Sequence, residues 1–149
     1  MAIADTRTNK NIDQLNSFLR GEISAVETYR QALERLNHSA SRSQLLDCHL
    51  SHEQRIEKLR AQVARLGGQP SDNSGPWGAF AKLIEGGAKI FGEKAAISAL
   101  EEGEDHGLKL YRDEIGKLDQ ESRRLVEAEL LPAQERTHRT MSSIKHALH

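Results

Sequence analysis

Apolar residues recur at intervals of three and four along most of this chain, which is the spacing of side chains on one face of an α-helix. Four segments with this pattern are long enough for helices of about 37 Å, at about 1.5 Å per residue. Short polar breaks separate the first segment from the second and the third from the fourth. The pattern therefore predicts four amphipathic helices, covering about 11–36, 41–66, 93–118 and 120–147.

The residues at the breaks agree with this division. Asn9 or Asn11 can cap the first helix, and a double glycine followed by Pro70 ends the second. Pro132 lies inside the fourth helix, where its missing amide donor predicts a kink or a restart. The crossover of residues 67–92 is long enough to run the length of the bundle and contains a short amphipathic segment. We expect two antiparallel helix hairpins joined by this crossover, which would hold a short connecting helix.

Size and composition support a single helical domain. A chain of 149 residues with 4% aromatic residues and only 3 Pro favours an all-α fold. We expect residues 1–10 to form a flexible N-terminus and residues 11–149 to form one domain. With 21 Lys and Arg against 22 Asp and Glu, the formal charge of -1 indicates no nucleic-acid partner.

Compartment and covalent chemistry are also constrained. The first ten residues lack the apolar run of a signal peptide, and no stretch reaches 18 consecutive apolar residues. We therefore expect no transmembrane segment and a cytoplasmic protein, with a homodimer as one arrangement. Cys48 is the only cysteine, which excludes an internal disulfide and a thiolate metal site within one chain. Any metal must then bind to carboxylate and imidazole groups.

A charged pattern repeats inside two of the apolar stripes. The stretches GEISAVETYR at 21–30 and GEDHGLKLYR at 103–112 share Gly-Glu, six residues and Tyr-Arg, and a shift of 82 residues superposes the flanking apolar positions. Glu22 and Glu104 therefore lie on stripes that face the core. A carboxylate in a core costs several kcal/mol unless it is paired, protonated or bound to a metal.

Two further helices contribute core-facing polar residues. His49 and His52 lie on the stripe of the second helix, and Glu135 and His138 share a face of the fourth. Residues at i and i+3 of a helix point the same way, so each pair can reach one centre. Three carboxylates in one dry layer would repel each other, and a divalent cation would relieve that repulsion. Oxygen and imidazole ligands suit iron, manganese or zinc.

These residues resemble the ferritin-like superfamily of di-iron carboxylate bundles, whose pattern is Glu, Glu-x-x-His, Glu, Glu-x-x-His on four successive helices. Glu22, Glu104, and Glu135 with His138 match the first, third and fourth elements, and Tyr29 matches a core Tyr of bacterioferritin-like proteins. The resemblance covers nearly the whole chain and is closest to uncharacterised bacterial members. It implies a ferritin-like four-helix bundle with a di-iron centre, and zinc or manganese as alternative metals. If the centre is redox-active, it implies a non-haem di-iron oxidase or peroxidase that depends on an external electron donor.

The second helix departs from that pattern, because His49 stands where the family has a bridging Glu. Glu53 could swing inward to supply the missing negative charge. Leu50 stands where bacterioferritins carry the haem-ligating Met, so no haem is expected. Glu22 and His52 are 52 − 22 = 30 residues apart in the first hairpin, whereas Glu104 and His138 are 138 − 104 = 34 residues apart in the second. Either the first turn between helices is tighter, or the ligand of the second helix lies nearer Glu53 or Glu57.

No catalytic residue is assigned, and the candidate metal ligands are Glu22, His49, His52, Glu53, Glu104, Glu135 and His138. Tyr29 and Tyr111 are expected to be core aromatics whose hydroxyls could donate to a metal-binding carboxylate. Exposed positions are expected for the remaining histidines and for the acidic residues beside Glu104, which are His38, His106, His146, His149, Glu101, Glu102 and Asp105.

A metal-free interpretation stays open beside the di-iron one. In it, each buried Glu pairs with a buried Arg or with a Tyr hydroxyl inside the bundle. The protein would then be a stress-related or interaction protein that acts through the amphipathic crossover segment, GPWGAFAKLIEGGAKIFG.

Overall fold

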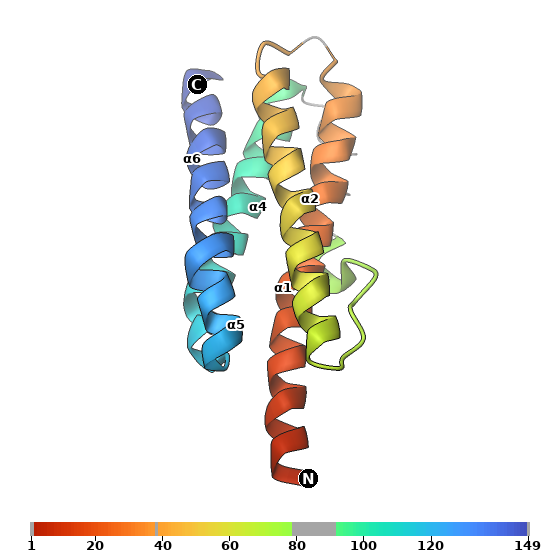
Figure 1. Cartoon of the computed structure of the whole chain (residues 1–149). Helices are drawn as coiled ribbons and strands as arrows, with labels where there is room; N and C mark the ends of the chain where they lie inside the picture. Colours follow the sequence, from red (N-terminus) through yellow and green to blue (C-terminus); the bar gives the residue numbers. More distant parts are fainter. Residues whose placement is uncertain (1, 38, 79–91, 149) are drawn as a thin grey trace.

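The computed structural model describes residues 2–37, 39–78 and 92–148, and all regular elements in these ranges are helical. One antiparallel hairpin consists of α1 (Ala2–Arg35) and α2 (Arg42–Arg65). Figure 1 shows this hairpin packed beside a second one, which starts with α4 (Glu93–Glu114) and returns through α5 (Gln120–Leu125) and α6 (Leu131–Leu148). The predicted all-α four-helix bundle of two hairpins is confirmed.

The ends of the first hairpin differ in how well they were predicted. The first helix begins at Ala2, before the expected caps, and its first turns extend past the rest of the bundle (Figure 1). The second helix ends where predicted, because Gly67 adopts a left-handed φ of 83°. The amides of Gly67 and Gly68 donate to the carbonyls of Ala64 and Val63. These bonds satisfy carbonyls at the helix end.

The fourth helix is interrupted at the place that Pro132 predicts. Asp119 caps its start by accepting a hydrogen bond from the Ser122 amide at 2.8 Å. The short helix α5 (Gln120–Leu125) passes into one π-helical turn, Val126–Leu130, and then into α6 (Leu131–Leu148). A proline has no amide to donate and its ring crowds the preceding turn, so a widened turn just before Pro132 accommodates it.

Buried apolar side chains form two clusters, one toward each end of the bundle. One includes Leu33, Leu45 and Leu100, and the other includes Leu15, Leu59 and Leu130. The residues between them on the long helices include most of the buried polar side chains. The bundle therefore has a polar layer between two apolar ones.

The remaining described elements are two short 3-10 helices, η1 (Gly75–Gly78) and η2 (Ile115–Lys117). The predicted connecting helix of the crossover falls on residues 79–91, which lie outside the described residues. Among the residues that are described, no helix is both long enough and apolar enough to span a membrane.

Candidate functional site

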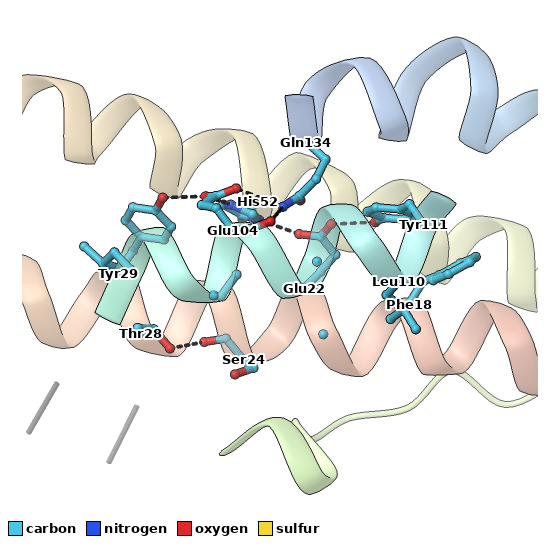
Figure 2. Close-up of a pocket in the computed structure, with 15 residues that line it drawn as sticks. Phe18, Glu22, Ser24, Thr28, Tyr29, His52, Glu104, Leu110, Tyr111 and Gln134 are labelled. Atoms are coloured by element: carbon cyan, nitrogen blue, oxygen red, sulfur yellow. Dashed lines mark hydrogen bonds and ion pairs between the residues drawn. The ribbon is translucent and has the colours of Figure 1, made fainter. Parts of the chain in front are cut away.

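Five side chains form a continuous chain of hydrogen bonds through the polar layer. Figure 2 shows His52 of α2 between Glu22 of α1 and Glu104 of α4. Its Nδ1 lies 2.5 Å from Glu22 Oε1 and its Nε2 lies 2.7 Å from Glu104 Oε2. The hydroxyl of Tyr29 donates to Glu104 Oε2 at 2.5 Å, and that of Tyr111 donates to Glu22 Oε2 at 2.5 Å. Because both ring nitrogens face carboxylates, the geometry suits a doubly protonated imidazolium.

A guanidinium lies in the same layer. Arg55, one turn after His52 on α2, is 1% exposed. Its Nη1 lies 3.4 Å from Glu22 Oε2 and also donates to Gln134 Oε1. Its Nη2 donates to Thr137 Oγ1 at 2.9 Å and to Ser51 Oγ at 3.0 Å. Arg55 therefore joins three of the four long helical segments.

The last segment, α6, supplies neutral hydrogen-bonding groups. Gln134 donates to Glu104 Oε1 at 2.9 Å, and the Thr137 hydroxyl is 2.7 Å from the same oxygen. Glu22 is 3% exposed and Glu104 is 2% exposed. Each of their oxygens has at least one donor at hydrogen-bond distance.

The charges in the layer hold each other in the ionised state. Burial alone would raise the pKa of a carboxyl, but Arg55 and then His52 outweigh it and lower the pKa of Glu22 to about 2. Burial is opposed in the same way at Glu104, whose pKa is lowered by His52 and Arg55. For His52, burial and Arg55 disfavour the charged ring, yet Glu104 and Glu22 raise its pKa above 6.5. Two negative and two positive charges therefore compensate each other.

The layer follows the internal repeat found in the sequence. The 82-residue shift relates Glu22 to Glu104 and Tyr29 to Tyr111, and each Tyr bonds to the Glu of the other repeat. The same shift relates His52 to position 134 and Arg55 to position 137, since 134 − 52 = 82 and 137 − 55 = 82. The sequence prediction missed Arg55, Gln134 and Thr137, although applying the shift to His52 would have pointed to position 134.

The prediction that Glu135 and His138 lie in the central layer is wrong. Both are partly exposed on α6: Glu135 pairs with Arg112 at 3.3 Å, and His138 bonds to Asp105. The buried face is displaced by one residue, which is about 100° around a helix. The π-turn before Pro132 widens the helix and rotates the residues after it. It brings Gln134 and Thr137 inward. Glu104 and Gln134 are then 134 − 104 = 30 residues apart, the same separation as Glu22 and His52 in the first hairpin.

The second helix places only His52 of its candidates in the layer. His49 is partly exposed and forms an ion pair at 2.9 Å with Glu53, which is itself exposed. Glu57, the other candidate, is exposed and pairs with Arg60 at 3.2 Å. The prediction that these three side chains could enter the layer is therefore wrong, because Arg55 takes the inward position one turn after His52.

A narrow cavity between α1 and α4 reaches this layer. It provides about 40 Å³ of space beside Glu22 and Glu104, which is enough for one or two water molecules. Gly21 and Gly103, the glycines of the repeated Gly-Glu pattern, line it. The two glycines therefore leave open the gap next to the carboxylates.

Comparison with known proteins identifies a family. The model of a family described as a domain of unknown function, DUF2383, matches residues 10–117. The chain belongs to the DUF2383 family. The match includes Glu22, His52, Arg55 and Glu104, whereas Gln134 and Thr137 lie beyond it. No curated protein and no solved structure shows a significant match.

The residues of this DUF2383 chain do not fit two metal ions in the layer. Arg55 has no lone pair to offer and stays protonated. His52 uses both ring nitrogens toward carboxylates, and Gln134 points its amide nitrogen at Glu104. Only two carboxylates remain, and both accept hydrogen bonds from these groups. The donor set is that of a self-compensated ionic network.

The network predicts a stability maximum in mildly acidic solution. Because the pKa of Glu22 is lowered in the folded state, its contribution to stability is present above pH 4.5 and is lost as the pH falls toward about 2. The difference corresponds to about 3 kcal/mol. His52 has a raised pKa, so its contribution is present below 6.5 and is lost as pH rises through the folded value. Urea unfolding followed by circular dichroism between pH 2 and 9 measures both limbs.

Glu22→Gln is the control for the acid limb, because Gln cannot titrate. We expect the variant to lose less stability than the native chain between pH 5 and about 2, with Glu104 still contributing. An acid limb equally steep in the variant would show that Glu22 does not carry this dependence.

Proposed function

We propose that this DUF2383 protein is a metal-independent ferritin-like bundle and acts as a binding or structural protein rather than an oxidoreductase. The observation that carries this proposal is the buried guanidinium of Arg55. It lies 3.4 Å from the Glu22 carboxylate and within hydrogen-bond distance of Gln134 and Thr137. A permanent cation therefore lies among the groups that would otherwise surround metal ions.

The spacing of the layer supports the ferritin-like part of the proposal. Single carboxylates come from α1 and α4, and pairs at i and i+3 come from α2 and α6. This is the arrangement of the pattern Glu, Glu-x-x-His, Glu, Glu-x-x-His. In place of the Glu-x-x-His pairs, the chain has His52 with Arg55 and Gln134 with Thr137. The positions are kept, whereas the ligand chemistry is replaced.

Charge explains how such a layer can be stable without metal. A metal centre in a bundle compensates buried carboxylates, and here His52 and Arg55 do so for Glu22 and Glu104. Thiol chemistry is also disfavoured, since burial raises the pKa of Cys48 to about 12. The groups of the layer thus serve as fixed donors and acceptors that specify how the helices pack.

Two exposed apolar side chains are available for a binding role. Leu46 and Leu50 lie one turn apart on α2 and are 46% and 54% exposed. No other large hydrophobic side chain is exposed among residues 6–37, 39–76 and 92–148. Binding through the amphipathic crossover stays a prediction, because residues 79–91 lie outside the described residues. Iron, zinc or manganese in the layer, and an oxidase or peroxidase activity, likewise stay untested predictions.

Metal analysis combined with thermal unfolding tests the proposal. We expect chain purified without chelator to hold no tightly bound metal, and we expect EDTA to leave its Tm unchanged. A core ion present at about 100 times its Kd would contribute about 2.7 kcal/mol. Its removal would lower the Tm of a chain of this size by several degrees.

The control is the double variant Glu22→Gln, Glu104→Gln, which removes both carboxylates from the layer. Stoichiometric metal that survives gel filtration of the native chain, is absent from the double variant and raises the native Tm would overturn the proposal. The native chain and the double variant are expected to have the same, near-zero content of retained metal.

A further inference from the structure

A second group of metal-binding residue types lies on the outer side of the α4–α6 pair. Glu101 and Asp105 are one turn apart on α4, and His138 faces them from α6. One ligand atom from each lies within 4.8 Å of the others. We propose that these three side chains bind one divalent transition-metal ion, with Zn²⁺ as the expected occupant.

The chemistry of the three groups matches this class of ion. Two carboxylate oxygens and one imidazole nitrogen are common Zn²⁺ ligands, and three protein ligands leave coordination positions for water. Ligands at about 2.1 Å from an ion lie about 3 to 3.5 Å apart in tetrahedral or octahedral geometry. His138 Nε2 and Asp105 Oδ1 are already in hydrogen-bond contact. A Glu101 oxygen lies within 4.8 Å of both of these atoms, so an ion at a common centre requires only a short movement of the side chains.

The burial of the Glu101 carboxylate is the strongest reason to expect a cation at this site. Its side chain is 13% exposed, against 24% for His138 and 53% for Asp105. The cation paired with it is Lys145, whose Nζ is 3.5 Å from Oε1. A largely buried carboxylate favours a nearby cation, a role that either Lys145 or a metal ion can fill. Lys145 is 39% exposed and has a flexible stem, so it can move away when an ion binds.

The surroundings leave room for the rest of a coordination sphere. An open groove of about 450 Å³ adjoins Glu101 and is lined also by Ser142, Lys145 and His146. Water molecules in this groove can complete the sphere of an ion at Glu101. The site is separate from the buried layer, because His138 points outward from α6 whereas Gln134 and Thr137 point inward.

Calorimetric titration of the chelator-stripped full chain with ZnCl₂ in a non-coordinating buffer tests the assignment. We expect one ion per chain with a Kd in the micromolar range. His138→Ala and Glu101→Ala should each weaken binding by about 10-fold or more, since each removes one of three ligands. Lys145→Ala should tighten binding, because it removes the cation that competes for Glu101.

His49→Ala is the matched control, since His49 and Glu53 form a His–carboxylate pair on α2 that has no third ligand among the residues that the structure describes. Its Kd should equal that of the native chain, and circular dichroism verifies the fold of each variant. The inference is overturned by the absence of saturable binding, or by an equal loss in His49→Ala. Binding that disappears in His146→Ala but persists in Glu101→Ala also overturns it.

Binding that persists in His138→Ala and disappears in Glu104→Gln would place the ion in the buried layer. That outcome would overturn both this inference and the proposed function. Loss of Zn²⁺ binding in His138→Ala, together with a native Tm that EDTA does not change, supports both the surface site and the proposed function.

Discussion

Replacing Arg55 with Met will lower the free energy of unfolding by about 3–5 kcal/mol, the cost of removing one partner from a buried ionic network. Met has a similar length and fills the space, so the loss is electrostatic. Without the guanidinium, Glu22 loses a cation at 3.4 Å, and Gln134, Thr137 and Ser51 lose hydrogen-bond donors. Urea denaturation at pH 6 measures the effect.

Arg60→Met is the control for this experiment. Arg60 lies on the same helix and pairs with Glu57 at 3.2 Å, but its side chain is 45% exposed. An exposed pair of this kind contributes about 0–1 kcal/mol, so little change is expected. In the Arg55→Met background, Glu22→Gln should cost less than it does in the native chain, because the charge it removes has already lost its partner. A loss below about 1 kcal/mol for Arg55→Met would contradict the buried position of the guanidinium.

A chain in which both i, i+3 pairs are changed to Glu-x-x-His is expected to bind two divalent ions in the layer. The four substitutions are His52→Glu, Arg55→His, Gln134→Glu and Thr137→His. They replace the two cations and two neutral groups by the ligand types of the ferritin-like pattern, beside the existing Glu22 and Glu104. Metal analysis should give two ions per chain, in contrast to the native layer.

Stability should then depend on the metal. The apo form carries four buried carboxylates and has lost the permanent positive charge of Arg55, so we expect it to be less stable than the native chain. Free metal at about 1,000 times the Kd would restore about 4.1 kcal/mol, a rise in Tm on the order of 10 °C for a chain of this size. The further substitution His138→Ala removes the surface metal site, so that any effect of metal on the Tm comes from the buried layer. A Tm that does not respond to metal would mean that these six positions do not form the metal-centre geometry.

Much of the fold could be predicted from the chain alone, because helix periodicity and breakers are local signals. The apolar stripe from Leu15 to Leu36 marked the first helix, and the double glycine after Leu66 marked the end of the second. The repeated Gly-Glu stretches also identified Glu22 and Glu104 as buried, and their two tyrosines as partners. These inferences needed only spacing along one helix.

The site was predicted less completely, because its composition depends on how helices face each other. The same residues allowed either a metal centre or a metal-free pairing with Arg and Tyr. The structure brings Arg55 and Tyr111 to Glu22, and metal binding in the layer stays a prediction. The error on the fourth helix came from the π-turn before Pro132. A Glu-x-x-His spacing in the sequence suggested ligands, although a rotation of one residue places both on the surface.

The sequence by itself determined that the chain forms four amphipathic helices with acidic residues inside two of the apolar stripes, because side-chain periodicity and burial preference act within each helix. Only the tertiary structure decided what compensates those acids. The rotation of α6 and the inward direction of Arg55 follow from the packing of helices far apart in the sequence. That packing brings His52 and Arg55 to the carboxylates and leaves His138 outside with Asp105.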